Sequence, residues 1–139
     1  MRRAREALRS AIGAIFGKAR TGLEEFTEPP EVLHDREIVA WSRSVPGTVR
    51  IGEASLRTRV RLAGEVRVVT VRTDTPWPDF EAVLFDGTGD VRLRWLGVQE
   101  IPGVVPGTRM VVEGVLGEED GEPLMIDPSY ELSFTPERP

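Results

Sequence analysis

The feature that most constrains this chain is a β-hairpin predicted around Asp-Gly-Thr-Gly at residues 86–89. Asp-Gly between two alternating strand segments is a strong hairpin signal, because glycine readily adopts the positive φ of a tight turn. With residues 86–89 as the loop, Phe80 faces Trp95 and Glu81 faces Arg94. Successive side chains of a strand point to opposite sides, so one face of the hairpin is apolar and the other is left to contact a partner. The apolar face comprises Phe80, Ala82, Leu84, Val91, Leu93 and Trp95.

Further β-strands are predicted on both sides of the hairpin. The residue pattern places strands at 57–73, 80–85, 90–97, 109–116 and 124–126. The first is interrupted at Ala63-Gly64, and a glycine inside a long strand typically marks a bulge or a sharp bend. The connection over residues 99–107 contains two prolines and two glycines, so no long helix is expected there. A bent first strand and a longer connection between the third and fourth strands are typical of an all-β fold, the five-stranded Greek-key barrel called the OB-fold.

Short motifs in the predicted barrel resemble those of nucleic-acid-binding OB-folds. The hairpin at residues 86–89 is similar to one in the anticodon-binding domains of class II tRNA synthetases and in the wedge domain of fork-remodelling helicases. More narrowly, residues 84–88, 95–97 and 128–132 resemble the LFDG-S/T, WLG and P-x-YEL motifs of small stand-alone OB-fold proteins of actinobacterial type, from high-GC Gram-positive bacteria. The resemblance covers residues 48–132. It implies a nucleic-acid-binding OB-fold, and no catalytic motif comes with it.

Arginines of the first and third strands are the candidate binding residues. OB-folds that bind single strands combine a basic groove with aromatic side chains on which bases stack, and they use the second and third strands with the adjoining loops. Arg92 and Arg94 lie on the outward side of the third strand, and Arg67 and Arg72 follow the bend of the first. Trp77 lies between two prolines in the loop after the first strand, which is a rigid mount for a stacking ring.

The same residues also have purely structural interpretations. Glu81 faces Arg94 in the predicted hairpin, and opposite charges at such positions stabilise a sheet modestly. Trp77 equally suits a role in covering one end of the barrel. The acidic loop at residues 118–120 lies between the fourth and fifth strands, where its carboxylates would repel phosphates. From the sequence alone, replacing both Arg92 and Arg94 with glutamate is expected to leave folding nearly intact and to abolish nucleic-acid binding.

Four segments are predicted along the chain. Residues 1–23 have apolar residues at three- and four-residue steps with arginines opposite, which predicts an amphipathic helix that packs on its own barrel, lies on a membrane surface or forms a homo-oligomer through residues 2–23. Residues 24–45 are predicted to be an acidic, proline-containing linker, in which residues 37–41 form either one short helical turn or an edge strand. His34 is expected to be a solvated side chain rather than a ligand, because metal sites need several ligands. Residues 46–132 form the barrel, and residues 133–139 form a flexible tail. The apolar run over residues 11–16 is too short for a transmembrane segment, and a cytoplasmic location is the default.

Composition excludes several kinds of chemistry. The chain has no cysteine and one histidine, so no disulfide, metal site or cofactor is expected, and enzymatic activity is not predicted. The net charge is −5, with basic residues concentrated in residues 1–20 and acidic residues in residues 24–37 and from residue 112 onwards.

Two hypotheses for the function remain. The first is a non-enzymatic module that binds single-stranded or structured nucleic acid, either DNA or RNA. The second is a protein-interaction or oligomerisation adaptor, membrane-proximal in one variant.

Overall fold

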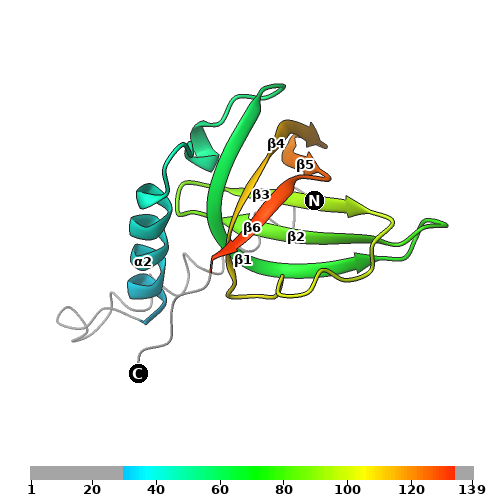
Figure 1. Cartoon of the computed structure of the whole chain (residues 1–139), viewed down its shortest axis with the longest axis horizontal. Coiled ribbons are helices and arrows are strands. Elements are labelled where there is room, and N and C mark those ends of the chain that lie inside the picture. The colour runs from blue at the N-terminus through cyan, green and yellow to red at the C-terminus, as the bar shows by residue number, and fades with distance from the viewer. Residues whose placement is uncertain (1–29, 134–139) are drawn as a thin grey trace.

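The computed structural model describes residues 30–133, in which one α-helix precedes a ring of β-strands (Figure 1). Neighbouring strands follow the order β1-β2-β3-β5-β4-β6, and β1 also pairs with β4. The first five strands therefore close into the predicted ring, and β6 lies outside it along β4. The helix predicted over residues 1–23 and the tail from residue 134 lie outside the described residues. The elements are α2 (Pro30–Ser44), the 3-10 turn η2 (Ile51–Glu53), β1 (Arg59–Arg72), β2 (Asp79–Phe85), β3 (Asp90–Leu96), β4 (Arg109–Glu119), β5 (Glu122–Ile126) and β6 (Ser129–Ser133).

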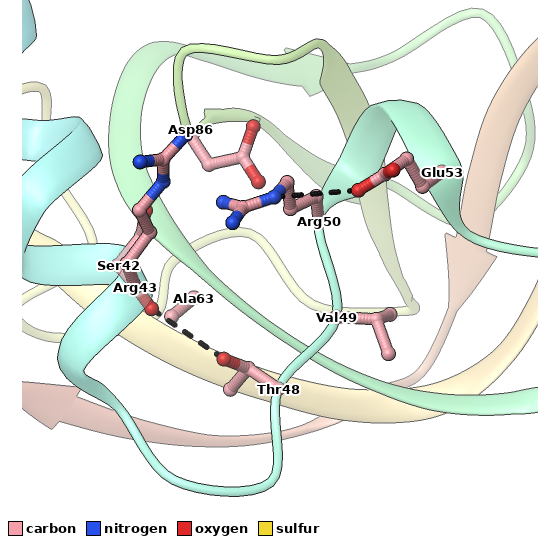
Figure 2. Close-up of a pocket in the computed structure, with 8 residues that line it drawn as sticks. All are labelled: Ser42, Arg43, Thr48, Val49, Arg50, Glu53, Ala63 and Asp86. Atoms are coloured by element: carbon pink, nitrogen blue, oxygen red, sulfur yellow. Dashed lines mark hydrogen bonds and ion pairs between the residues drawn. The ribbon is translucent and has the colours of Figure 1, made fainter.

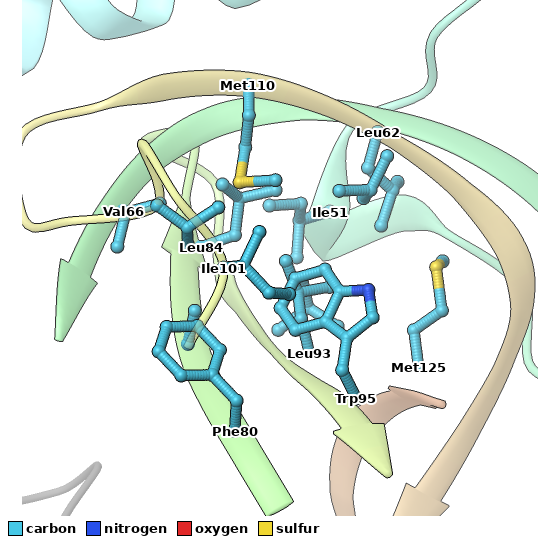
Figure 3. Close-up of a cluster of buried hydrophobic side chains, with 14 of the residues drawn as sticks. Ile51, Leu62, Val66, Phe80, Leu84, Leu93, Trp95, Ile101, Met110 and Met125 are labelled. Carbon is cyan, nitrogen blue, oxygen red and sulfur yellow. The ribbon is translucent and has the colours of Figure 1, made fainter. Parts of the chain in front are cut away.

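The register of the β2–β3 hairpin confirms the sequence prediction. Phe80 lies opposite Trp95, and Glu81 lies opposite Arg94. The apolar face points into the ring, where it meets side chains from β1, β4 and β5 (Figure 3). Burying one large apolar side chain stabilises a fold by about 1.5–3 kcal/mol, so this face supplies much of the driving force. The connection between β3 and β4 contains no helix, and its residue Ile101 packs into the core.

Strand β1 is shared by the two halves of the ring. Its first half pairs with β4 and its second half with β2, so that Glu65, at the overlap, faces Arg109 on one side and Phe85 on the other. An added Cβ at Gly64 would lie 2.6 Å from the Phe85 carbonyl oxygen, which explains the glycine at this crossing. The register shift itself lies between residues 66 and 68, slightly later than the interruption predicted at 63–64.

Residues 30–44 form helix α2, so the prediction of a linker over residues 24–45 is wrong for this part. Two consecutive prolines suggest the end of a helix, yet proline is also favoured in the first turn, where its missing N–H is not needed and its fixed φ suits the helix. Pro30 is the first residue of α2, and Ile38 and Ser42, one turn apart, are buried. Packing of these two residues against the sheet stabilises the helix, although most of its other residues are polar or charged. No helix in residues 30–133 is long and apolar enough to cross a membrane.

The motif at residues 128–132 contributes to the core through strand β6. β6 pairs antiparallel with β4, and before it Asp127 adopts a positive φ of 49° that turns the chain out of β5. The indole N–H of Trp95 donates a hydrogen bond to the carbonyl oxygen of Pro128 at 3.1 Å. The rings of Trp95 and Tyr130 meet edge to face with their centroids 5.8 Å apart. Both contacts are favourable for a buried tryptophan and fix β6 against the ring.

Candidate functional site

The candidate binding surface is the side of strands β1, β2 and β3 that points away from the core. Alternation along the paired strands brings Thr70, Glu81 and Arg94 into one row. The next row joins Val83 to Arg92, and the end of β1 adds a further arginine. We name this surface the outer face. It comprises Val68, Thr70, Arg72, Glu81, Val83, Arg92 and Arg94.

Carboxylates from β2 and β4 link the three arginines of the outer face. Nη1 of Arg72 lies 3.3 Å from Oε2 of Glu81, and Nε of Arg94 donates to the same carboxylate. The guanidinium of Arg94 also binds Glu119 through two hydrogen bonds of 2.9 Å each. Nη2 of Arg92 lies 3.2 Å from Oε1 of Glu119. The structure thus brings together three of the predicted site residues and confirms the pairing of Glu81 with Arg94.

The charges of this network stabilise one another. Hydrogen bonding to Arg94 is the main cause that lowers the pKa of Glu119 from 4.5 to about 2, against the opposing effect of burial, and Arg92 adds to the lowering. Hydrogen bonding to Glu119, with a further contribution from Glu81, raises the pKa of the Arg94 guanidinium. Glu119 and Arg94 are therefore both charged at neutral pH. The side chain of Arg94 is only 7% exposed, whereas that of Glu119 is 34% exposed.

A tight turn positions Glu119 beside the arginines. β4 and β5 are joined by Asp120 and Gly121, whose φ angles are 54° and 78°. Positive φ at both central residues is typical of the type I′ hairpin turn, whose twist matches that of paired strands. The sequence identifies the acidic loop as a source of repulsion, but not Glu119 as the partner of the arginines. The Asp-Gly pair in the loop was a signal in the sequence for this tight turn. The sequence did not show that β3 pairs with β5, which is what brings Glu119 to the arginines of β3.

Arg67 lies apart from this network, at the contact between β1 and α2. Its Nη2 donates a hydrogen bond to Asp35 of α2 at 2.7 Å, and its guanidinium carbon lies 4.3 Å from the centre of the Phe85 ring. The buried Glu65 is hydrogen-bonded to Nε2 of His34 at 2.7 Å. The side chain of His34 is 47% exposed, which agrees with the prediction of a solvated side chain, but its ring also anchors α2 to β1, which was not predicted. Helix α2 lies against this end of the sheet, opposite the end that carries the β1–β2 loop (Figure 1).

Trp77 is an exposed aromatic side chain in the loop that follows Arg72 at the end of the outer face. It lies between Pro76 and Pro78 in the loop that joins β1 to β2, and it is 75% exposed. The hydroxyl of Thr75 donates to its carbonyl oxygen, which holds the loop backbone in a local turn. This exposure does not support the interpretation that Trp77 covers an end of the barrel.

A pocket of about 340 Å³ lies between the end of α2 and the β2–β3 turn (Figure 2). Arg43 and Arg50 line it together with Glu53 and the buried Asp86. Arg50 pairs with Glu53 at 3.3 Å, and Asp86 accepts a hydrogen bond from the backbone N–H of Ile51 at 2.8 Å. Because two basic and two acidic side chains balance here, the pocket offers a charged ligand little net attraction. Within residues 30–133, no cluster of three or more histidine, cysteine, aspartate or glutamate side chains is arranged to hold a metal ion.

The arrangement of the ring resembles that of a known OB domain. The solution structure of the OB domain of Ta0387 from Thermoplasma acidophilum matches with a TM-score of 0.51 and 14% identity, over 66% of this chain and 91% of that chain. At this identity the likeness concerns the fold alone, and it agrees with the OB-fold predicted from the sequence. No protein-family model and no curated protein matches the sequence.

Two structures with lower scores have nucleic acid bound. RecG bound to a three-way DNA junction matches with a TM-score of 0.45 and 21% identity, over 54% of this chain and 11% of that chain. A replication protein A heterotrimer bound to single-stranded DNA matches with a TM-score of 0.45 and 14% identity, over 72% of this chain and 78% of that chain. Likenesses at this level do not define a ligand for the present chain. The narrower resemblance to actinobacterial-type proteins stays a prediction.

Proposed function

We propose that this protein is a non-enzymatic OB-fold module that binds single-stranded nucleic acid along the outer face. The observation that carries the proposal is the position of Trp77. It has the greatest exposure of any large hydrophobic side chain in residues 30–133, and its loop adjoins the strands that carry Arg72, Arg92 and Arg94. An aromatic platform beside arginines supplies both stacking and phosphate contact, the two interactions by which OB-folds hold single strands.

The arginines have different roles in this proposal. Arg72 is more exposed than Arg92 or Arg94 and contacts the nucleic-acid backbone directly. Arg92 lies at the edge of the network and provides a second contact. Arg94 is held by Glu81 and Glu119 and orients the network for as long as Glu119 stays bound to it. Arg67 stabilises the contact with α2 and belongs to the fold rather than to the binding surface.

The test is fluorescence anisotropy of labelled oligothymidine and oligouridine, at low and near-physiological salt. We expect saturable binding that weakens as salt rises, because phosphate contacts release counterions. Trp77→Ala should weaken binding by about tenfold or more, since stacking is worth about 1–3 kcal/mol per base, and Trp77→Phe should retain most of the affinity. Arg72→Ala should weaken it more than the matched Arg59→Ala, because Arg59 pairs with Glu113 away from the outer face. Absence of binding to either oligonucleotide at low salt would refute the proposal.

A protein partner is the second candidate ligand, and a specific observation favours it. Val68, Leu96 and Ile126 are half-exposed apolar side chains on the outer face or on the same side of the neighbouring strands, and all three arginines of the outer face are already paired with carboxylates. Exposed apolar side chains that cluster often mark protein-binding surfaces. Under this alternative the full chain self-associates in sedimentation experiments, Leu96→Glu abolishes the association, and oligonucleotides do not bind. The proposed role of residues 2–23 in oligomerisation is tested by removing residues 1–28 and measuring the mass in solution, and the proposed membrane contact by comparing the binding of both proteins to lipid vesicles.

A further inference from the structure

We propose that Glu119 sets the affinity and selectivity of the outer face by occupying the position in which Arg92 and Arg94 would hold a phosphate. The inference rests on the proposed function, because it assigns a competitor to the same binding surface. A guanidinium binds carboxylates and phosphates in the same forked geometry. The two hydrogen bonds from Arg94 to Glu119, each 2.9 Å, and the third contact from Arg92 at 3.2 Å have that geometry.

The structure also indicates which member of the network can leave. Glu119 is the more exposed partner and lies at the end of the β4–β5 hairpin, whereas Arg94 is nearly buried. When Glu119 moves away, Arg94 keeps its contact with Glu81 through Nε. The guanidinium therefore retains its orientation and exposes the edge that faced Glu119. A phosphate approaching this edge replaces one anion with another.

This exchange makes the surface selective. A free phosphate gains little, because it only replaces a carboxylate that is already well bound. A single strand gains more, because its bases stack on Trp77 while its phosphate reaches the arginines, and the two contacts are linked through one chain. The acidic loop that would repel phosphates thus becomes the element that rejects anions without bases.

Two matched variants of the β4–β5 hairpin test the inference. Glu119→Gln removes the competing charge, and Glu118→Gln removes an equal charge from the adjacent exposed residue, which faces Pro123 in the ladder. Binding of labelled oligothymidine is measured by anisotropy at several salt concentrations for the wild type and both full-length variants. We expect Glu119→Gln to bind about tenfold more tightly than the wild type, and Glu118→Gln to stay within about twofold because its charge is screened by salt. The salt dependence of Glu119→Gln should also become steeper.

Glu119→Asp provides a variant of unchanged net charge. Its shorter side chain reaches the arginines less well, so it should also bind the oligonucleotide more tightly than the wild type. Thermal unfolding of each variant establishes that it is folded, and Glu119→Asp replaces Glu119→Gln if the latter is not. If the wild type binds and the Glu119 variants resemble Glu118→Gln, the inference is overturned and the proposed function stands. If none of the folded proteins binds at low salt, both are overturned.

Discussion

Arg94 lies between carboxylates of two different strands, Glu81 on β2 and Glu119 on β4, and little of its side chain reaches solvent. The sequence suggests that Arg92→Glu with Arg94→Glu leaves folding nearly intact. The structure leads to a different expectation, because the double variant places four carboxylates together. Breaking a buried ion pair costs about 3–5 kcal/mol, so we expect a large loss in the free energy of unfolding. Urea denaturation measures it, with Arg59→Glu at an exposed pair as the control; equal stabilities of the two variants would contradict this account.

Glu119 gives the fold a specific response to acid. Its pKa in the folded protein is about 2, below the ordinary value of 4.5, so its stabilising contribution is fully present above pH 4.5 and is lost as the pH falls toward 2. We expect the free energy of unfolding of the wild type to fall more steeply over this window than that of Glu119→Gln. Urea denaturation at constant ionic strength, repeated at several pH values, measures both slopes. Parallel curves would show that the ion pair does not persist in solution.

Helix α2 is the element that the sequence predicts least well, and one contact with the β2–β3 turn makes its position testable. Gly87 has a φ of 94°, and an added Cβ would overlap Cγ2 of Val39 in α2. Gly107 has a φ of 95° with nothing within 4 Å of an added Cβ. Gly107→Ala therefore measures the backbone strain alone, about 1–2 kcal/mol, and Gly87→Ala should cost about 1–3 kcal/mol more because the helix must shift.

The same pair of variants distinguishes the helix contact from turn strain. In a Val39→Ala background the side chain that blocks the new methyl group is gone, so the additional cost of Gly87→Ala should largely disappear. Thermal or urea unfolding of the wild type, Gly87→Ala, Val39→Ala and the double variant completes the comparison. Equal costs for Gly87→Ala and Gly107→Ala would mean that α2 does not pack on this turn in solution.

At the scale of the whole molecule, the parts that could be predicted are those encoded by neighbouring residues. The register of the β2–β3 hairpin and the positions of the strands along the chain follow from alternation and from the Asp-Gly turn, which are local signals. Helix α2 depends on burial of Ile38 and Ser42 by distant strands, and its first residue is a proline that also fits the end of a helix. The partners of Arg92 and Arg94 depend on the parallel pairing of β3 with β5, which no local pattern reveals. Three of the four arginines predicted from the sequence therefore lie together, whereas Arg67 lies apart, and the carboxylate that binds Arg92 and Arg94 was not predicted.

The double pairing of β1 also bears on the order in which the barrel assembles. The β2–β3 and β4–β5 pairs join neighbouring segments, so they close short loops and form rapidly. The β1–β4 pair joins Arg59 to Val115 and can form only after the whole intervening chain is available, and such non-local pairings are slow. During synthesis, the apolar face of the β2–β3 hairpin consequently stays exposed to water until β4 has left the ribosome. A nascent chain stalled in the β3–β4 connection would be a natural client for a chaperone.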